Sequence, residues 1–247
     1  MRASTPGRAP EPEHRADSAT PGAPGSLDSS GPLRCAGVGL AYSDGDVTTH
    51  AVTDVTLILP PTGVVGIMGP SGSGKSSLLY LLSGLKRPTS GSVRYGDLEM
   101  TSLGEASLAR LRRQRFGFVF QQPFLLNYLT ARENVLAAAA PGDREADARA
   151  EALFTALGIA AYRDRFPYHL SGGERQRLCV ARAMVNRPEV IFADEPTAAL
   201  DHANGHAVID LLFGYRERGL VIVVTHDPEM LTGADAVYRM RDGRLEG

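Results

Sequence analysis

Short runs of apolar and small residues alternate along the chain with longer segments of helical pattern. Apolar runs of this length predict strands that are buried on both faces, as in a parallel sheet. Because helices are predicted between these strands, the alternation predicts an α/β fold. The predicted strands of this sheet cover residues 64–68, 116–120, 190–193, 220–225 and 236–240.

Two regions depart from this alternation. Residues 34–42 and 52–59 predict an antiparallel strand pair, and residues 92–95 predict a further short strand. Between residues 130 and 185 the pattern is helical throughout, so we expect an all-helical insert that forms a second lobe. The predicted helices cover residues 75–85, 102–113, 130–139, 143–157, 172–185, 201–215 and 228–231.

Composition limits the folded region and the classes of partner. Residues 1–32 are rich in Pro, Gly and Ser, so we expect a disordered tail before a folded domain over residues 33–247. The formal net charge of −2 gives no electrostatic footprint for nucleic acid. The two cysteines form no disulfide framework, which favours a reducing compartment. No apolar run approaches the roughly 18 residues of a membrane span, so we expect any membrane role to act through a partner.

A phosphate-binding loop is predicted directly after the strand at residues 64–68. The pattern G-x-x-x-x-G-K-[ST] lies between that strand and a helix, where backbone N–H groups and the helix N-terminus converge on phosphate oxygens. Lys75 is expected to reach the outer phosphates, and the Ser76 hydroxyl to hold Mg²⁺. Lys75 is one of only two lysines in the chain, so a lysine at this position is informative. The predicted nucleotide-binding residues of this loop are Gly69, Pro70, Ser71, Gly72, Ser73, Gly74, Lys75, Ser76 and Ser77.

Two carboxylates follow the strand at residues 190–193. Because the carboxyl ends of parallel strands form the ligand-binding edge of such sheets, Asp194 and Glu195 are expected near the phosphate loop. Asp194 suits Mg²⁺, and Glu195, pointing elsewhere by strand alternation, suits polarisation of the attacking water. The alternative is a simple charged pair that ends a strand.

Three further residues are candidates at the same site. His226 and Gln121 each follow a predicted strand, where His226 would touch the γ-phosphate and Gln121 would sense Mg²⁺ and water. Tyr42 is a candidate for stacking on adenine. The structural alternatives are an ordinary histidine after a strand and a tyrosine packed in the core.

A second anion site is predicted where Leu-Ser-Gly-Gly-Glu-Arg-Gln opens a helix. Ser171 is a natural N-cap, and Gly172 and Gly173 expose backbone N–H groups. The alternative is a plain capped helix. Because one chain then carries two complementary halves of a phosphate clamp, two chains are expected to close around each nucleotide.

Taken in order, these motifs resemble those of ATP-binding cassette (ABC) ATPases from about residue 33 to 247. The resemblance implies a RecA-like phosphate-loop NTPase core with an antiparallel β subdomain and an inserted helical subdomain over about 122–185. It implies ATP and Mg²⁺ held in a head-to-tail dimer, with a homodimer expected here. The family residues carried over to this chain are Tyr42, the loop 69–76, Gln121, the signature Ser171, Gly172, Gly173, Glu174 and Arg175, Walker B 190–195, Asp201 and His226.

Within the family, residues 117–122, 126–135 and 170–177 look most like the lipoprotein-release and macrolide-exporter subgroup. That likeness implies a separately encoded integral-membrane permease, with this chain bound peripherally at the cytoplasmic face of the cell membrane. Residues 122–129 are expected to bind a cytoplasmic helix of that permease, and this stretch is called the docking segment here. A regulatory ATPase of the cell-division type is the alternative. A soluble ABC factor acting on DNA or ribosomes is disfavoured by the single cassette, the absence of heptads and the charge of −2.

Overall fold

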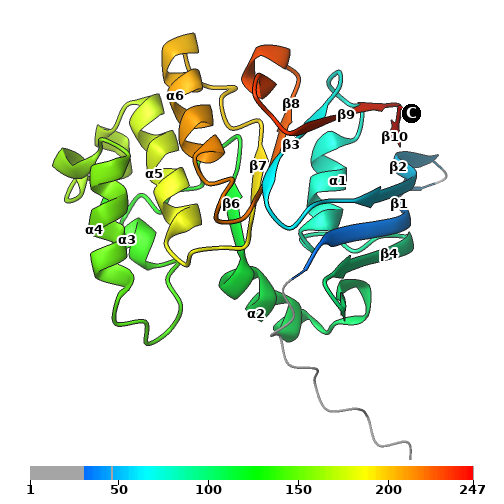
Figure 1. Ribbon diagram of the computed structural model, residues 1–247, viewed down its shortest axis with the longest axis horizontal. Helices are drawn as coiled ribbons and strands as arrows, with labels where there is room; N and C mark the ends of the chain where they lie inside the picture. The colour runs from blue at the N-terminus through cyan, green and yellow to red at the C-terminus, as the bar shows by residue number, and fades with distance from the viewer. Residues whose placement is uncertain (1–30, 46, 247) are drawn as a thin grey trace, which may run out of the picture.

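The computed structural model describes residues 31–45 and 47–246. The predicted disordered tail therefore lies outside the described residues, apart from its last two positions. Two sheets lie side by side, and the helices within residues 131–184 and 202–213 gather on the far side of the larger sheet (Figure 1). The predicted architecture, an α/β core with an antiparallel β part and a helical part, is confirmed.

The smaller sheet is antiparallel with strand order β2-β1-β4-β5. Its long strands β1 (Leu33–Asp44) and β2 (Val47–Ile58) confirm the predicted pair and begin or end within a few residues of expectation. Strand β4 (Ser90–Tyr95) was also predicted, whereas the two-residue β5 (Leu98–Glu99) was missed. Two residues leave too short a pattern for sequence reasoning to detect.

The larger sheet has the order β10-β9-β3-β8-β7-β6, in which only β10 runs antiparallel to its neighbour. Every residue of β7 and β8 is buried, which confirms the expectation from their continuous apolar runs. The strands of this sheet are β3 (Gly63–Met68), β6 (Phe116–Val119), β7 (Val190–Asp194), β8 (Leu220–Thr225), β9 (Ala236–Arg241) and β10 (Arg244–Leu245).

Helix α1 (Lys75–Leu82) lies between the two sheets (Figure 1). Its four leucines are buried with residues from both sheets in one apolar cluster, so the helix that follows the phosphate loop is fixed by packing on two sides. The helix ends three residues before the predicted position. Helix α2 (Glu105–Arg115) also begins later than predicted, because residues 100–102 form a separate 3₁₀ turn, η1 (Met100–Ser102).

The three helices predicted between residues 130 and 185 are present, and each is shorter than predicted. The helix predicted from residue 143 begins at Ala146, because the Asp143 carboxylate accepts from the Glu145 N–H and pairs with Arg149. Gly142 and Gly158 adopt left-handed backbone angles on either side. The helices and 3₁₀ turns here are α3 (Ala131–Leu136), α4 (Ala146–Ala156), η2 (Ala160–Tyr162), η3 (Pro167–His169) and α5 (Gly172–Met184).

Helices α5 and α6 (His202–Phe213) cover the face of the large sheet opposite α1. Buried residues of the helical part share one apolar cluster with this face; Phe154 of α4, fully buried, belongs to the same cluster as Ile191 of β7. The helical part is therefore packed onto the sheet through a shared core. The 3₁₀ turn η4 (Pro228–Leu231) confirms the predicted short helix. Among the described helices, none has the length and apolar character needed to cross a membrane.

Candidate nucleotide site

The loop between β3 and α1 is shaped by two close backbone approaches. Gly74, the N-cap of α1, has φ +97°, and a Cβ at this position would lie 2.1 Å from the carbonyl oxygen of Ala51. A Cβ at Gly69 would lie equally close to the carbonyl oxygen of Met240. Only glycine fits at either position, so strands β2 and β9 fix the curve of the loop.

The Lys75 side chain is directed into this curve. It is 6% exposed, and its Nζ donates to the carbonyl oxygens of Gly69 (2.8 Å) and Pro70 (2.9 Å). The Ser73 hydroxyl is buried and has no hydrogen-bond partner among the described residues. A buried cation and an unpaired hydroxyl in one tight loop fit an anionic ligand with oxygen acceptors.

Asp194, at the end of β7, faces the start of α1. Its Oδ1 accepts a 2.7 Å hydrogen bond from Ser76 Oγ, and its Oδ2 accepts a 2.8 Å bond from the Tyr80 hydroxyl. Burial and the hydrogen bond to Asp194 raise the pKa of Tyr80 to about 12, so the phenol stays protonated and donates. Hydroxyl and carboxylate oxygens are the donor set that suits Mg²⁺, and residues 76 and 194 provide it.

Glu195 turns away from Asp194 and toward His226. Its backbone is left-handed (φ +46°), which directs the side chain away from the strand as β7 ends. Nδ1 of His226 lies 3.0 Å from both carboxylate oxygens of Glu195. The Glu195 side chain is 14% exposed and that of His226 is 59% exposed, so the pair extends from the buried edge of the sheet to solvent.

Gln121 and Tyr42 lie at the margins of the site. Gln121 is exposed two residues beyond the end of β6, at the carboxyl edge of the sheet. Tyr42, on β1, is 41% exposed, and Lys86 Nζ lies 4.4 Å from its ring centroid. The hydrogen bond to Lys86 and a further one to Ser77 lower the pKa of Tyr42. Tyr42 is therefore not a core residue, and one face of its ring is already covered by a cation.

The predicted second anion site is a capped helix start. Ser171 Oγ accepts from the Glu174 N–H at 3.3 Å, and Glu174 Oε2 accepts from the Ser171 N–H at 2.7 Å. Burial raises the pKa of Glu174, but hydrogen bonds from Ser171 and Tyr162 more than offset it and keep the carboxyl ionised. The capping box holds the segment 171–174 in a fixed conformation.

Asp201 caps α6 close to this second site. Its carboxylate accepts from the Asn204 N–H (3.0 Å) and side-chain amide (2.7 Å), and these bonds lower the pKa of Asp201. A Cβ on Gly173 would lie 2.9 Å from Asn204 Oδ1, and Arg177 donates to the same oxygen. Asn204 thus joins the starts of α5 and α6.

Sequence reasoning missed two polar residues that organise these groups. Tyr80 lies one helical turn beyond Ser76, and this i, i+4 spacing was the available signal that both face Asp194. Asn204 carried no signal beyond its place three residues after Asp201. The structure therefore assembles two clusters, the phosphate loop with 194, 195 and 226, and residues 171–174 with 201. Among the described residues, no hydrogen bond joins residues 171–174 to the phosphate loop.

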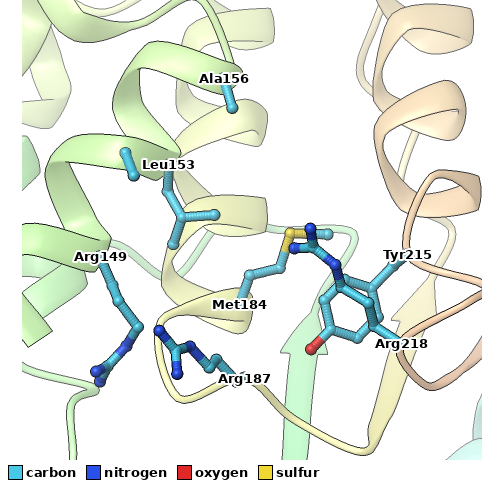
Figure 2. Close-up of a pocket in the computed structure, with 8 residues that line it drawn as sticks. Arg149, Leu153, Ala156, Met184, Arg187, Tyr215 and Arg218 are labelled. Carbon is cyan, nitrogen blue, oxygen red and sulfur yellow. The ribbon is translucent and has the colours of Figure 1, made fainter.

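A cavity of about 700 Å³ lies at the opposite edge of the sheet and is separate from the nucleotide site. Arg149 and Arg187 extend side by side at its mouth, and Arg218 lies beside Tyr215 and Met184 (Figure 2). Residues 187 and 218 directly precede β7 and β8, whereas 194 and 226 end or follow those strands. This cavity therefore lies at the other end of β7 and β8 from Asp194 and His226.

A family model described as ABC transporter matches residues 52–198. The macrolide export ATP-binding/permease protein MacB of Neisseria meningitidis serogroup B is 42% identical over 217 residues, covering 86% of this chain and 34% of that protein. The protein of the same name from Bradyrhizobium diazoefficiens is 46% identical over 206 residues, covering 82% of this chain and 32% of that protein. This chain spans about a third of the length of these curated relatives.

Solved structures give the same result for the fold. The ATP-binding cassette MJ0796, solved as a dimer in a post-hydrolysis state with ADP and Pi, is similar with a TM-score of 0.81 and 34% identity. The match covers 87% of this chain and 97% of that chain, and a second dimeric structure of MJ0796 matches equally well. The predicted resemblance is confirmed: the chain belongs to the ABC transporter family and has the fold of its nucleotide-binding ATPase cassettes.

Proposed function

We propose that the chain binds ATP with Mg²⁺ at the loop between β3 and α1 and hydrolyses ATP to power a membrane transporter. The observation that carries this proposal is the 2.7 Å hydrogen bond between Ser76 and Asp194 beside the buried Lys75 ammonium. Ser76 and Asp194 would hold Mg²⁺, which when bound neutralises phosphate charge and orients the terminal phosphoryl group. Lys75 would exchange its two carbonyl partners for phosphate oxygens, and Ser73 would gain the partner it lacks.

Glu195 is the proposed general base for the attacking water. Its side chain is only 14% exposed to solvent. Glu195 directly follows Asp194, the proposed metal ligand at the end of β7, and His226 orients its carboxylate from one side. His226 is proposed to contact the γ-phosphate while it positions Glu195. Gln121 is proposed to contact Mg²⁺ and the water from the exposed side. Tyr42 is proposed to stack on adenine with the ring face that Lys86 leaves open.

A second copy of the chain is proposed to complete each nucleotide site. Residues 171–174 and Asp201 form a cluster of their own with N–H groups at a helix start, and hydrogen bonding keeps its conformation fixed. In a head-to-tail homodimer, this cluster would cover the phosphates bound by the other chain. The dimeric state of MJ0796 supports this arrangement.

The partner proposed for the dimer is an integral-membrane permease. In the docking segment (residues 122–129), Phe124, Leu126 and Tyr128 are 64%, 39% and 75% exposed, while Leu125 packs against the core. Beside it is a cavity of about 330 Å³, here called the aromatic groove. It is lined by aromatic and basic side chains, namely Phe116, Phe118, Phe120, Phe124, Arg112, Arg113 and Arg182. An amphipathic helix with an apolar face and acidic flanks fits such a surface.

The names of the relatives favour export over a regulatory role of the cell-division type. Those names join ATP-binding and permease functions in one protein, whereas the proposal for this chain is a permease on a separate chain. The site of action proposed is the cytoplasmic face of the membrane, where ATP is supplied. The compound moved would be set by the permease.

Replacing Glu195 tests the proposed activity directly. Glu195→Gln keeps size and polarity but removes the base, so ATP hydrolysis by the purified chain should fall by about 10²–10⁴ while ATP binding is retained. The matched control is Glu217→Gln, an exposed carboxylate next to the opposite edge of the sheet. Hydrolysis by Glu195→Gln near the parent rate would exclude Glu195 as the base. Absence of Mg²⁺-dependent ATP hydrolysis in the parent dimer and in its complex with the permease would reject the function itself.

A further inference from the structure

Three side chains of metal-ligating type converge where α6 meets η4, away from the phosphate loop. His202 and His206 lie one turn apart on α6, and Glu229 comes from η4. The possible ligand atoms of all three lie within 4.8 Å of one another. His202 Nε2 is 3.0 Å from Glu229 Oε2 and 3.2 Å from His206 Nε2. The three side chains therefore meet around a single point.

These spacings match a zinc coordination shell. Zinc in proteins takes imidazole nitrogens and carboxylate oxygens at about 2.0–2.2 Å in a tetrahedron, so neighbouring ligand atoms lie about 3.3–3.6 Å apart. The two measured separations are close to that edge length. Glu229 and His202 are each 68% exposed, so rotation of their side chains can bring the remaining pair of atoms together.

Hydrogen bonding alone accounts poorly for the convergence. His202 Nε2 makes both short contacts, and a single hydrogen on this nitrogen points along only one of them. With the ring hydrogens on Nδ1, two imidazole lone pairs and a carboxylate face one another. A divalent cation is attracted to all three groups at once.

The backbone holds the ligands in place on both sides. His202 follows Asp201, the N-cap of α6, whose carboxylate is fixed by Asn204. Glu229 is fixed on η4 because its N–H donates to Asp227 at 2.9 Å. The ligands thus come from two segments that begin with capped, defined turns.

We propose that His202, His206 and Glu229 form a binding site for Zn²⁺ or a similar borderline transition cation, with water or another ligand in the fourth position. The two-imidazole, one-carboxylate set favours Zn²⁺ over Mg²⁺, which prefers oxygen ligands. The bound ion would clamp the start of α6, next to Asp201, to the segment that follows His226. The site does not depend on the proposed ATPase function, because its ligands are separate from the phosphate loop.

Direct binding measurements test the site. The full chain, without a polyhistidine tag, is titrated with ZnCl₂ by calorimetry in a buffer that contains millimolar Mg²⁺. One Zn²⁺ per chain with micromolar affinity is expected, together with a rise in Tm because the ion binds the folded state. His206→Ala and Glu229→Gln should each weaken binding by about tenfold or more, since each removes one of three ligands. Co²⁺ bound in place of Zn²⁺ should give the visible absorption of a tetrahedral site.

Matched histidine variants separate this site from adventitious binding. His50 and His169 are exposed and lie elsewhere in the fold, so His50→Ala and His169→Ala should leave the affinity unchanged. Circular dichroism of each variant confirms that it is folded. The proposal is overturned if the parent shows no saturable Zn²⁺ binding. It is equally overturned if folded His206→Ala and Glu229→Gln bind Zn²⁺ as tightly as the parent. Neither result bears on ATP binding, which is measured separately with Mg²⁺ and ATP.

Discussion

Ser76 Oγ donates a 2.7 Å hydrogen bond to Asp194 Oδ1, joining the start of α1 to the end of β7 across 118 positions of sequence. The other oxygen of Asp194 accepts from Tyr80, one turn along the same helix. Both carboxylate oxygens are therefore held by α1, which sets the orientation of the proposed metal ligand.

Asp194→Asn should raise the Mg²⁺ concentration needed for half-maximal ATP hydrolysis and lower the maximal rate by about tenfold or more. The substitution removes a negative charge from a proposed ligand while keeping its shape. The measurement is ATPase rate against Mg²⁺ concentration at fixed ATP. Asp210→Asn, an exposed aspartate on α6, serves as the control and should follow the parent curve.

Tyr80→Phe should have a smaller effect at the same carboxylate. Loss of the hydroxyl removes one charged hydrogen bond, which should lower the free energy of unfolding by about 1–2 kcal/mol. Because Asp194 becomes freer to rotate, the Mg²⁺ requirement should rise by a few-fold. Urea unfolding and Mg²⁺ titration measure the two effects. An unchanged Mg²⁺ requirement would leave Tyr80 with a purely structural role.

Two substitutions should separate the halves of the proposed clamp. Lys75→Ala should weaken ATP binding by the single chain, whereas Ser171→Arg should keep that binding and abolish ATP-dependent dimerisation. Mixed dimers should regain one competent site of two. Fluorescent-nucleotide binding, size-exclusion chromatography and ATPase assays of mixtures measure these outcomes. If heterodimers form but stay inactive at every ratio, the site does not cross between chains.

Leu126→Glu and Tyr128→Glu should each abolish binding to the permease and its stimulation of ATP hydrolysis. Both introduce a charge on the exposed docking segment, while the basal ATPase rate should largely survive. Co-purification with the permease is the measurement. Leu85→Glu and Tyr168→Glu alter residues of similar exposure, 40% and 61%, outside this segment and should bind normally. Normal stimulation in both docking variants would exclude the segment.

Both cysteines should resist alkylation in the native state. Burial raises the pKa of Cys35 and of Cys179 from 9.0 to about 11, so at pH 8 the thiolate fraction falls by about 100-fold. Because the folded pKa exceeds the unfolded one, their contribution to stability is complete below pH 9 and is lost as the pH rises toward 11. Mass spectrometry after iodoacetamide treatment should find both sites unmodified without denaturant and modified in urea.

Most strands and helices of the fold could be predicted from the strongest periodic patterns in the sequence. Strands β7 and β8 are apolar at every core position, and their predicted ends agree with the structure to within one residue. Helix starts with a capping box were also predictable, as at Thr130 and Ser171, because the cap residue and its glutamate lie three positions apart. The gaps between the helices of the helical part were predicted as well, but the start of α4 was not, because the local turn at Asp143 overrides helical composition.

The same distinction between local pattern and long-range packing applies to the candidate site. The tight loop that contains Gly74 and Lys75 could be predicted from the local spacing of its residues. Strand alternation predicted that the Glu195 side chain points away from Asp194. In the structure a left-handed backbone conformation at Glu195 sets this direction, and the sequence pattern does not predict that conformation. Contacts across long sequence separation, such as Tyr80 with Asp194, depend on how α1 is placed between two sheets. Such placement is a property of the packed core.

Asn134 fixes the backbone of the proposed docking segment. Its side chain is 1% exposed; its Oδ1 accepts from the Leu126 N–H at 2.7 Å, and its Nδ2 donates to the carbonyl oxygens of Leu126, Leu129 and Thr130. The backbone beneath the exposed side chains is thus ordered in the isolated chain. A partner helix that binds here has little backbone entropy left to remove, so more of the contact energy is retained as affinity.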